Sequence, residues 1–257
     1  MTKNLPNLKV VSLSKLVLHE FVDPSRVKRL SNKIKRDKIF TNPPLVAPIG
    51  QSGKFVVLDG ANRTTVFKKL GFKDIVVQIV TSDNPGLELK TWNHLVLGIT
   101  AKDFFLQLKK TVGKPMIKKF KLRRNKIICR PIKKGDFFKQ IEALNKMVDL
   151  YNKHYKFHRL DNASDFSKNE QGKTLVVFPK FTPQDIILVA EKNLKVPSGI
   201  TRHLISGRAL RLDLPMTILR QNKSLVWKNE QLKKLIRQRF EENKIRHYQE
   251  PIFIFND

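Results

Sequence analysis

The clearest chemistry in the sequence lies in a turn that joins a short apolar run to a helical pattern. Val56–Leu58 predicts a buried strand, Asp59 and Gly60 interrupt the apolar run, and a helical pattern follows until Gly71. A helix that begins at a glycine turn presents backbone N–H groups at the positive end of its dipole, where phosphate binds well. Arg63 could add a bidentate phosphate contact, and Asp59 could hold a metal ion or a hydroxyl group. The same residues also suit an ordinary turn with a capping aspartate and a solvated arginine, so local sequence leaves both interpretations open.

A second polar cluster lies in a loop pattern far along the chain. Pro197 and Gly199 shape a loop that continues into Thr201, Arg202 and His203. A hydroxyl, a guanidinium and an imidazole together suit a carboxylate or a phosphate. Short polar loops are common, so this cluster is a weak signal by itself.

Two further residues occupy positions where sites are often built. Glu20 lies between a strand pattern and a helix that begins at Asp23 with proline next, and such connections frequently carry function. The alternative is a solvent-exposed loop glutamate. Trp92 stands two residues before His94, a pair that would ordinarily indicate core packing beside a surface imidazole.

The elements that must position these residues form an α/β pattern. Strands are expected over residues 9–18, 45–47, 54–58, 75–80, 174–178 and 245–255, and helices over 24–38, 63–70, 103–110, 136–155, from 183, and over 225–242. We expect residues 1–82 to form one compact unit and residues 83–257 to form a second α/β region that contributes the loop at 196–203.

The turn resembles a known signature. Asp59-Gly60-Ala61-Asn62-Arg63, followed by a short helix and Leu-Gly, is similar to the Asp-Gly-x-His-Arg motif of the ParB/sulfiredoxin-like superfamily. Ala61 stands where sulfiredoxins carry their cysteine, which excludes sulfiredoxin chemistry. The Gly-Glu-Arg-Arg box and the helix-turn-helix domain of ParB partition proteins are both missing. The remaining group is the free-serine kinases, which phosphorylate L-serine itself.

Three other stretches resemble the serine kinases in the family's order. They are Leu18-His19-Glu20, the Thr-Trp-x-His segment at 91–94, and the Val-Pro-x-Gly-x-Thr-Arg segment at 196–202, with Ser206-Gly207-Arg208 beyond it. The resemblance implies that Glu20 is the catalytic base, that Asp59 is catalytic and holds Mg²⁺, that Gly60, Ala61, Asn62, Arg63 and Thr64 bind the nucleotide phosphates, and that Trp92, Thr201, Arg202 and His203 bind the substrate.

The implied protein has a ParB/sulfiredoxin-like N-terminal unit with a mixed sheet and a C-terminal α/β extension. Its implied reaction transfers a phosphoryl group from ADP or ATP to L-serine to give O-phospho-L-serine. Asn62 departs from the family's usual histidine, so a proton or metal role of that histidine is not carried over.

Composition supplies the rival hypothesis. The chain of 257 residues has 51 Lys and Arg against 22 Asp and Glu, a formal charge of +29. Such a charge favours nucleic acid, so the alternatives are a ParB-like DNA-binding protein and a kinase-like protein that regulates transcription. The basic residues are scattered along the chain, which favours a basic surface with weak, non-specific nucleic-acid binding.

Cysteine content and hydropathy indicate the compartment. A single cysteine, Cys129, flanked by isoleucines, predicts a core residue in a reducing cytoplasm. No signal peptide and no apolar run of about 18 residues is visible, so we expect a cytoplasmic protein without a membrane span, either monomeric or homodimeric.

Overall fold

The computed structural model describes residues 5–81, 84, 86–132, 134–166 and 171–247, which form two compact units. Unit 1 draws its described residues from Met1–Leu18, Val22–Glu88 and His203–Asp257, and unit 2 from His19–Phe21 and Leu89–Arg202. The segment from His203 onward therefore groups with the N-terminal unit, whereas we expected it to belong to the second region. No helix among the described residues is long and apolar enough to cross a membrane.

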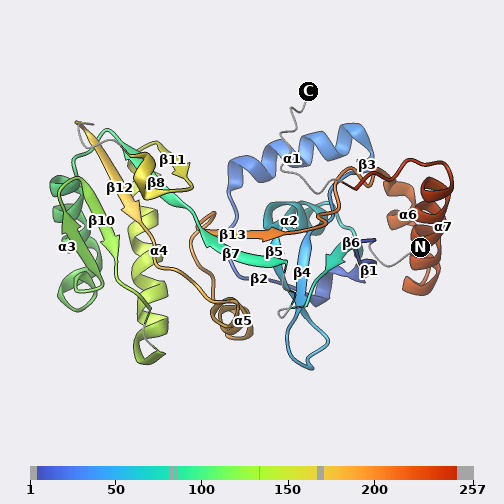
Figure 1. Ribbon diagram of the computed structural model, residues 1–257, viewed down its shortest axis with the longest axis horizontal. Helices are drawn as coiled ribbons and strands as arrows, with labels where there is room; N and C mark the ends of the chain where they lie inside the picture. Colours follow the sequence, from blue (N-terminus) through green and yellow to red (C-terminus); the bar gives the residue numbers. More distant parts are fainter. Residues whose placement is uncertain (1–4, 82–83, 85, 133, 167–170, 248–257) are drawn as a thin grey trace. The chain divides into compact units, whose positions relative to one another are not determined.

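Unit 1 is built on a five-stranded mixed sheet in the order β1-β6-β4-β5-β2 (Figure 1). Its strands are β1 (Leu8–Ser12), β2 (Leu16–Leu18), β4 (Leu45–Pro48), β5 (Phe55–Asp59) and β6 (Asp74–Ile79). The pairs β4–β6 and β2–β5 are parallel, while β1–β6 and β4–β5 are antiparallel. The predicted strands of the N-terminal unit are thus confirmed.

The helices of unit 1 begin at the signals that the sequence carries. Helix α1 (Pro24–Asp37) starts at Asp23, whose carboxylate accepts the backbone N–H groups of Ser25 and Arg26. Helix α2 (Ala61–Lys69) follows β5 directly and contacts α1. The remaining elements of unit 1 are η1 (Leu13–Lys15), β3 (Ile39–Phe40), β14 (Leu214–Pro215), α6 (Met216–Arg220) and α7 (Leu225–Glu241).

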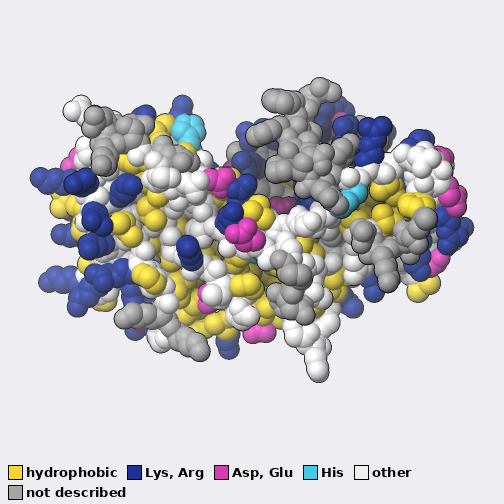
Figure 2. All heavy atoms as spheres, viewed as in Figure 1, with side chains coloured by type: hydrophobic (Ala, Val, Ile, Leu, Met, Phe, Trp, Pro, Cys, Tyr) yellow, Lys and Arg dark blue, Asp and Glu magenta, His cyan; other side chains and the backbone are white. Residues whose placement is uncertain are grey.

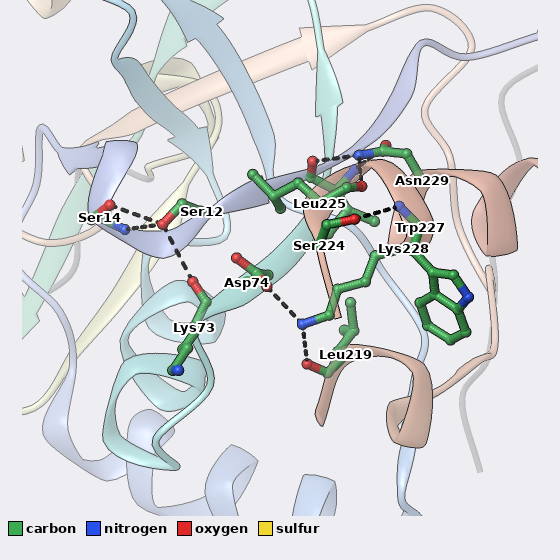
Figure 3. A network of polar contacts seen from close by, with 11 residues as sticks. Ser12, Ser14, Lys73, Asp74, Leu219, Ser224, Leu225, Trp227, Lys228 and Asn229 are labelled. Carbon is green, nitrogen blue, oxygen red and sulfur yellow. Dashed lines mark hydrogen bonds and ion pairs between the residues drawn. The ribbon is translucent and has the colours of Figure 1, made fainter. Parts of the chain in front are cut away.

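The C-terminal helices complete the core of unit 1. Leu232 of α7 is buried in the same hydrophobic cluster as the strands of the sheet. Lys228, only 2% exposed, donates to Asp74 on β6 at 2.7 Å and to the Leu219 carbonyl at 2.9 Å (Figure 3). Asn229 exchanges two hydrogen bonds with the backbone of Val10 on β1. These contacts explain why the segment groups with unit 1.

Unit 2 contains a second five-stranded sheet in the order β11-β8-β12-β10-β9, with β10–β12 its parallel pair. Its strands are β8 (Asn93–Leu97), β9 (Phe120–Arg123), β10 (Lys126–Cys129), β11 (Phe157–Leu160) and β12 (Lys173–Val177). Its helices are α3 (Ala101–Ile117), η2 (Lys134–Asp136), α4 (Phe137–His154), η3 (Ala163–Asp165) and α5 (Pro183–Glu191). Strands β7 (Leu87–Thr91) and β13 (Thr201–Ile205) pair with each other and carry residues of both units.

Most predicted elements of unit 2 and of the C-terminal segment are present. The apolar face of α4, which includes Leu144 and Tyr151, is buried, and so is Cys129, as predicted. The α3 span is longer than expected, because a second short helix follows Gly113, whose backbone is non-helical at φ 77° and ψ 169°. The strand expected over 245–255 lies mostly outside the described residues, and residues 245–247 are not in a strand.

Candidate functional site

The first turn of α2 leaves backbone donors free of any side-chain cap. Gly60 precedes the helix at φ 97° and supplies no capping side chain. A Cβ at this position would lie 3.0 Å from the Pro44 Cβ, so both the backbone angle and the space call for glycine. The first helical bond runs from the Thr64 N–H to the Gly60 carbonyl, so the N–H groups of Ala61, Asn62 and Arg63 precede the helical ladder. An anion is the natural partner for such donors.

Two buried polar atoms in the same turn strengthen this interpretation. The Nη1 atom of Arg63 and the Oγ1 atom of Thr64 are buried, and neither has a hydrogen-bond partner among the described residues. Burial lowers the pKa of Arg63 to about 10, an effect opposed by the Asp59 carboxylate and reinforced by the Arg208 guanidinium. Arg63 therefore stays charged at neutral pH. A charged donor with an unsatisfied nitrogen, beside an uncapped helix start, suits a phosphate.

The two remaining polar residues of the turn have defined partners. Asp59 accepts a hydrogen bond from Arg208 Nη2 at 2.8 Å. The amide oxygen of Asn62 accepts the backbone N–H of Asp23 at 3.0 Å and so ties α2 to the start of α1. Asn62, which stands where the resembled motif has histidine, thus has a structural contact through its oxygen.

A magnesium ion fits this turn only as part of a nucleotide complex. Among the described residues, no group of three or more His, Cys, Asp or Glu side chains could hold a metal ion. Mg²⁺ in kinase sites commonly binds one or two carboxylates together with substrate phosphates and waters. Asp59, which directly precedes Gly60 and has 57% of its side chain exposed, is a suitable single carboxylate.

In unit 2, the loop before β13 meets the predicted base. The Gly199 N–H donates to Glu20 Oε2 at 3.0 Å, and the backbone around Glu20 pairs with Val196. The neighbouring His19 is fully buried, and its Nε2 lies 2.9 Å from Thr201 Oγ1. The structure therefore brings a half-buried carboxylate and a hydroxyl to one loop.

Trp92 and Arg202 contact each other next to the same loop. The backbone N–H of Trp92 donates to the Ile200 carbonyl at 3.0 Å, and the Arg202 guanidinium lies 4.4 Å from the centre of the Trp92 ring. Arg202 also forms an ion pair with Asp161. Of the predicted substrate-binding residues, Trp92, Thr201 and Arg202 lie in unit 2, while His203, half-buried on β13, groups with unit 1.

His94 is a core residue of unit 2. It is fully buried among aromatic rings, including Phe157, which stacks on it at 4.4 Å. Its Nδ1 lies in hydrogen-bond contact with the Tyr151 hydroxyl, and its Nε2 lies 3.4 Å from the Gly199 carbonyl. Burial lowers the pKa of His94 to about 3, so the ring is neutral at physiological pH. It contacts the Gly199 loop through Nε2.

Four residues near these groups were not predicted from the sequence. Asp161 pairs with Arg202, Arg159 packs its guanidinium against Gly199, and Gln78 and Arg208 contact each other beside Asp59. Each of these contacts joins segments more than 30 residues apart, so no local pattern in the sequence indicates it. Arg208 alone had a local signal, the Ser-Gly-Arg motif, although its contacts were not predicted.

These features define a mixed α/β protein that has a helix start without a side-chain cap in one unit and a carboxylate near a hydroxyl group in the other. No protein-family model matches the chain. Over 224 residues it is 26% identical to the ATP-dependent L-serine kinase SbnI of Staphylococcus aureus, covering 84% of this chain and 85% of that protein. It is also 33% identical over 89 residues to an ATP-dependent L-serine kinase of Staphylothermus marinus, covering 35% of each chain.

Solved structures show the same architecture. C-terminally truncated SbnI from Staphylococcus aureus superimposes with a TM-score of 0.74 at 24% identity, covering 91% of this chain and 97% of that chain. A free serine kinase in complex with AMP gives 0.67 at 15% identity, covering 85% and 95%. A variant of a free serine kinase in complex with ADP gives 0.65 at 13% identity, covering 85% and 98%. The chain therefore has the fold of the free serine kinases.

Proposed function

We propose that this chain is a free L-serine kinase, which transfers the terminal phosphoryl group of a nucleotide to the serine hydroxyl and yields O-phospho-L-serine. The observation that carries the proposal is the first turn of α2. There the buried, charged Arg63 has a nitrogen with no partner among the described residues and the first N–H groups have no side-chain cap, so both can donate to an anion. It is supported by the L-serine kinase SbnI, which matches 84% of this chain, and by the shared fold.

The proposed roles fall into two sets of residues. Gly60–Thr64 bind nucleotide phosphates through backbone N–H groups and Arg63, and Asp59 is the residue that would hold Mg²⁺. In the other set, Trp92, Thr201, Arg202 and His203 bind serine or the transferred phosphoryl group, and Glu20 is the base. When bound, the magnesium ion supplies charge neutralisation at the phosphates.

The chemistry requires one proton acceptor and one leaving group. The serine oxygen forms a bond to the terminal phosphorus as its proton passes to the Glu20 carboxylate, and the bond from that phosphorus to the bridging oxygen breaks. The nucleotide leaves one phosphate shorter. Because phosphoryl transfer depends mainly on positioning and charge neutralisation, the guanidinium and backbone donors matter as much as the base.

ATP is the favoured donor, because the relatives are named ATP-dependent. ADP remains an alternative, since it presents a terminal phosphoryl to the same turn. Both substrates are cytoplasmic metabolites, which supports action in the cytoplasm.

The decisive experiment is incubation of the purified protein with L-serine, magnesium chloride and either ATP or ADP, with phosphoserine measured by mass spectrometry. D-serine and L-alanine serve as controls for stereochemistry and for the hydroxyl. Phosphoserine formed only with L-serine supports the proposal. Its absence with both nucleotides would overturn it, and would favour a nucleic-acid-binding function suggested by the +29 charge.

A further inference from the structure

A buried glutamine connects the sheet of unit 1 to the segment that carries Arg208. In the strand register, Leu45 pairs with Asp59 on one side and with Gln78 on the other, so the last two residues lie in one row across the sheet. Gln78 is 3% exposed, and its amide contacts three consecutive residues of the 207–209 segment. Its oxygen accepts the Ala209 N–H at 2.9 Å, and its Nε2 donates to the Gly207 carbonyl at 3.0 Å.

The third contact of Gln78 holds the Arg208 side chain. Arg208 Nη1 donates to Gln78 Oε1 at 3.1 Å, and Nη2 donates to Asp59 Oδ2 at 2.8 Å. The guanidinium therefore spans the row from β6 to the end of β5, with 19% of the side chain exposed. Fixed backbone on both sides of residue 208 leaves the side chain as the part that can change partner.

The charges at this point are unbalanced. Arg63 and Arg208 both act on the single Asp59 carboxylate, and Arg208 is close enough to lower the pKa of Arg63. Two guanidinium groups and one carboxylate leave one net positive charge beside the uncapped start of α2. A nucleotide phosphate would add negative charge here, and a magnesium ion held by Asp59 would compete with Arg208 for this carboxylate.

We propose that Arg208 is a second phosphate-binding arginine of the nucleotide site, and that Gln78 positions it to exchange Asp59 for the nucleotide phosphates. This inference rests on the proposed function. The exchange conserves charge pairing, because the Arg208 guanidinium leaves the Asp59 carboxylate for a phosphate. Both anions offer oxygens that fit the parallel N–H donors of the guanidinium. Asp59 becomes available as the carboxylate that would hold Mg²⁺. Gln78 is a positioning residue, because it acts through Arg208.

The first test is calorimetric titration of Arg208→Ala with ADP, in EDTA and in magnesium chloride. We expect ADP to bind roughly 10- to 100-fold more weakly, the usual loss for a hydrogen bond to a charged group. Arg208→Lys should recover only part of this loss, because an ammonium lacks the fork. Arg29→Ala removes the same charge from an exposed position of α1 and should leave binding unchanged.

The second test uses Asp59→Asn, for which the exchange predicts opposite effects in the two buffers. Without magnesium, the variant should bind ADP more tightly than the wild type, because Arg208 no longer has a carboxylate partner. With magnesium, it should bind more weakly. The gain in EDTA should disappear in the double variant Asp59→Asn/Arg208→Ala, which separates release of Arg208 from simple loss of a negative charge.

The role of Gln78 is tested by a double-mutant cycle. Gln78→Met should weaken ADP binding and raise the KM for nucleotide with little change in the KM for serine. In the Arg208→Ala background it should add nothing, whereas a merely structural role would add its full effect. If Gln78→Met does not fold, Gln78→Asn, which shortens the same amide, takes its place.

The outcomes separate this inference from the proposed function. Wild-type protein that binds no nucleotide would overturn the proposed function itself. Wild-type protein that binds ADP while Arg208→Ala binds it equally well would overturn only the role of Arg208. Tighter binding by Arg208→Ala in magnesium would show that the ion pair merely blocks Asp59, which also contradicts the proposal.

Discussion

Glu20, the proposed general base, is oriented by a backbone donor. The Gly199 N–H holds one carboxylate oxygen at 3.0 Å. We expect Glu20→Gln to keep the size of the side chain and remove the base, with a loss in kcat of roughly 10²–10⁴-fold. ADP affinity should change little, because the phosphates are assigned to other residues. Phosphoserine formation and calorimetry measure the two quantities, and near-wild-type turnover would end the assignment.

The Nη1 atom of Arg63 is buried and has no hydrogen-bond partner among the described residues. We expect Arg63→Ala to weaken nucleotide binding by roughly 10- to 100-fold and serine binding far less, because a charged hydrogen bond to phosphate is lost. Calorimetry with nucleotide alone, beside the exposed control Arg29→Ala, measures the effect. Unchanged affinity would mean that Arg63 only braces the turn against Asp59.

His94 makes the stability of the fold dependent on pH. Its pKa is about 3 in the folded protein, against an ordinary value of 6.5, because burial disfavours the charged ring. Between these values the unfolded chain binds a proton that the folded protein does not. The free energy of unfolding should therefore fall by up to about 1.4 kcal/mol per pH unit as pH drops from 6.5 toward 3.

His94→Gln provides the matched control, because glutamine keeps a donor and an acceptor without titrating. Urea unfolding at several pH values should show a shallower loss of stability in this variant than in the wild type. Equal slopes in the two proteins would contradict a neutral, buried His94.

At the scale of elements, the loop between α5 and β13 depends on one glycine. Gly199 has φ 70°, and a Cβ there would lie 2.0 Å from Arg159 Nη2. We expect Gly199→Ala to destabilise the protein by roughly 1–3 kcal/mol through strain and displacement of Arg159. Turnover should fall as well, because the Gly199 N–H orients Glu20.

Gly172→Ala is the control in the same unit. Gly172 also has a positive φ, 68°, but a Cβ there meets nothing within 4 Å. Denaturant unfolding of both variants separates backbone strain from the clash with Arg159. A Gly199→Ala variant no less stable than Gly172→Ala would show that Arg159 yields without cost.

The sequence predicted elements whose causes are local. Asp23 before Pro24 fixes the start of α1, and the spacing of apolar residues in α4 matches its buried face. Gly60 between a buried strand and a helix predicts the turn that carries Arg63. Each of these signals is contained within a few residues, where period and capping chemistry operate.

Contacts between distant segments could not be predicted in this way. Gln78 meets Gly207 across 129 residues, and Lys228 meets Asp74 across 154 residues. The amphipathic pattern of α7 indicates that one face is buried, but it does not say which sheet covers it. The pattern therefore did not predict that the segment from His203 onward groups with unit 1, or that Asp161 and Arg208 make their observed contacts.

At the scale of the whole molecule, the positive charge is spread rather than concentrated. Figure 2 shows Lys and Arg side chains over much of the visible face, with fewer Asp and Glu between them. The formal charge of +29 raises the potential around every cleft and attracts anionic nucleotides in general. A charge of this kind increases association rates more than it selects a partner.

Salt distinguishes this general attraction from a local site. A protein at +29 will bind DNA at low salt, because neutralising phosphates releases counterions whatever the sequence.

We expect the affinity of the protein for duplex DNA to fall steeply with the logarithm of salt concentration, with little preference among sequences. The affinity should be negligible near 150 mM, where exposed charges are screened beyond about 8 Å. Phosphoserine formation should persist there, because the Nη1 atom of Arg63, the proposed phosphate donor, is buried and therefore screened less by salt. Two salt titrations on one preparation, one of DNA retention and one of phosphoserine yield, make the comparison. Sequence-selective DNA binding that survives about 150 mM salt, a level that screens exposed charges, together with no phosphoserine from ATP or ADP, would replace the kinase with a ParB-like DNA-binding protein.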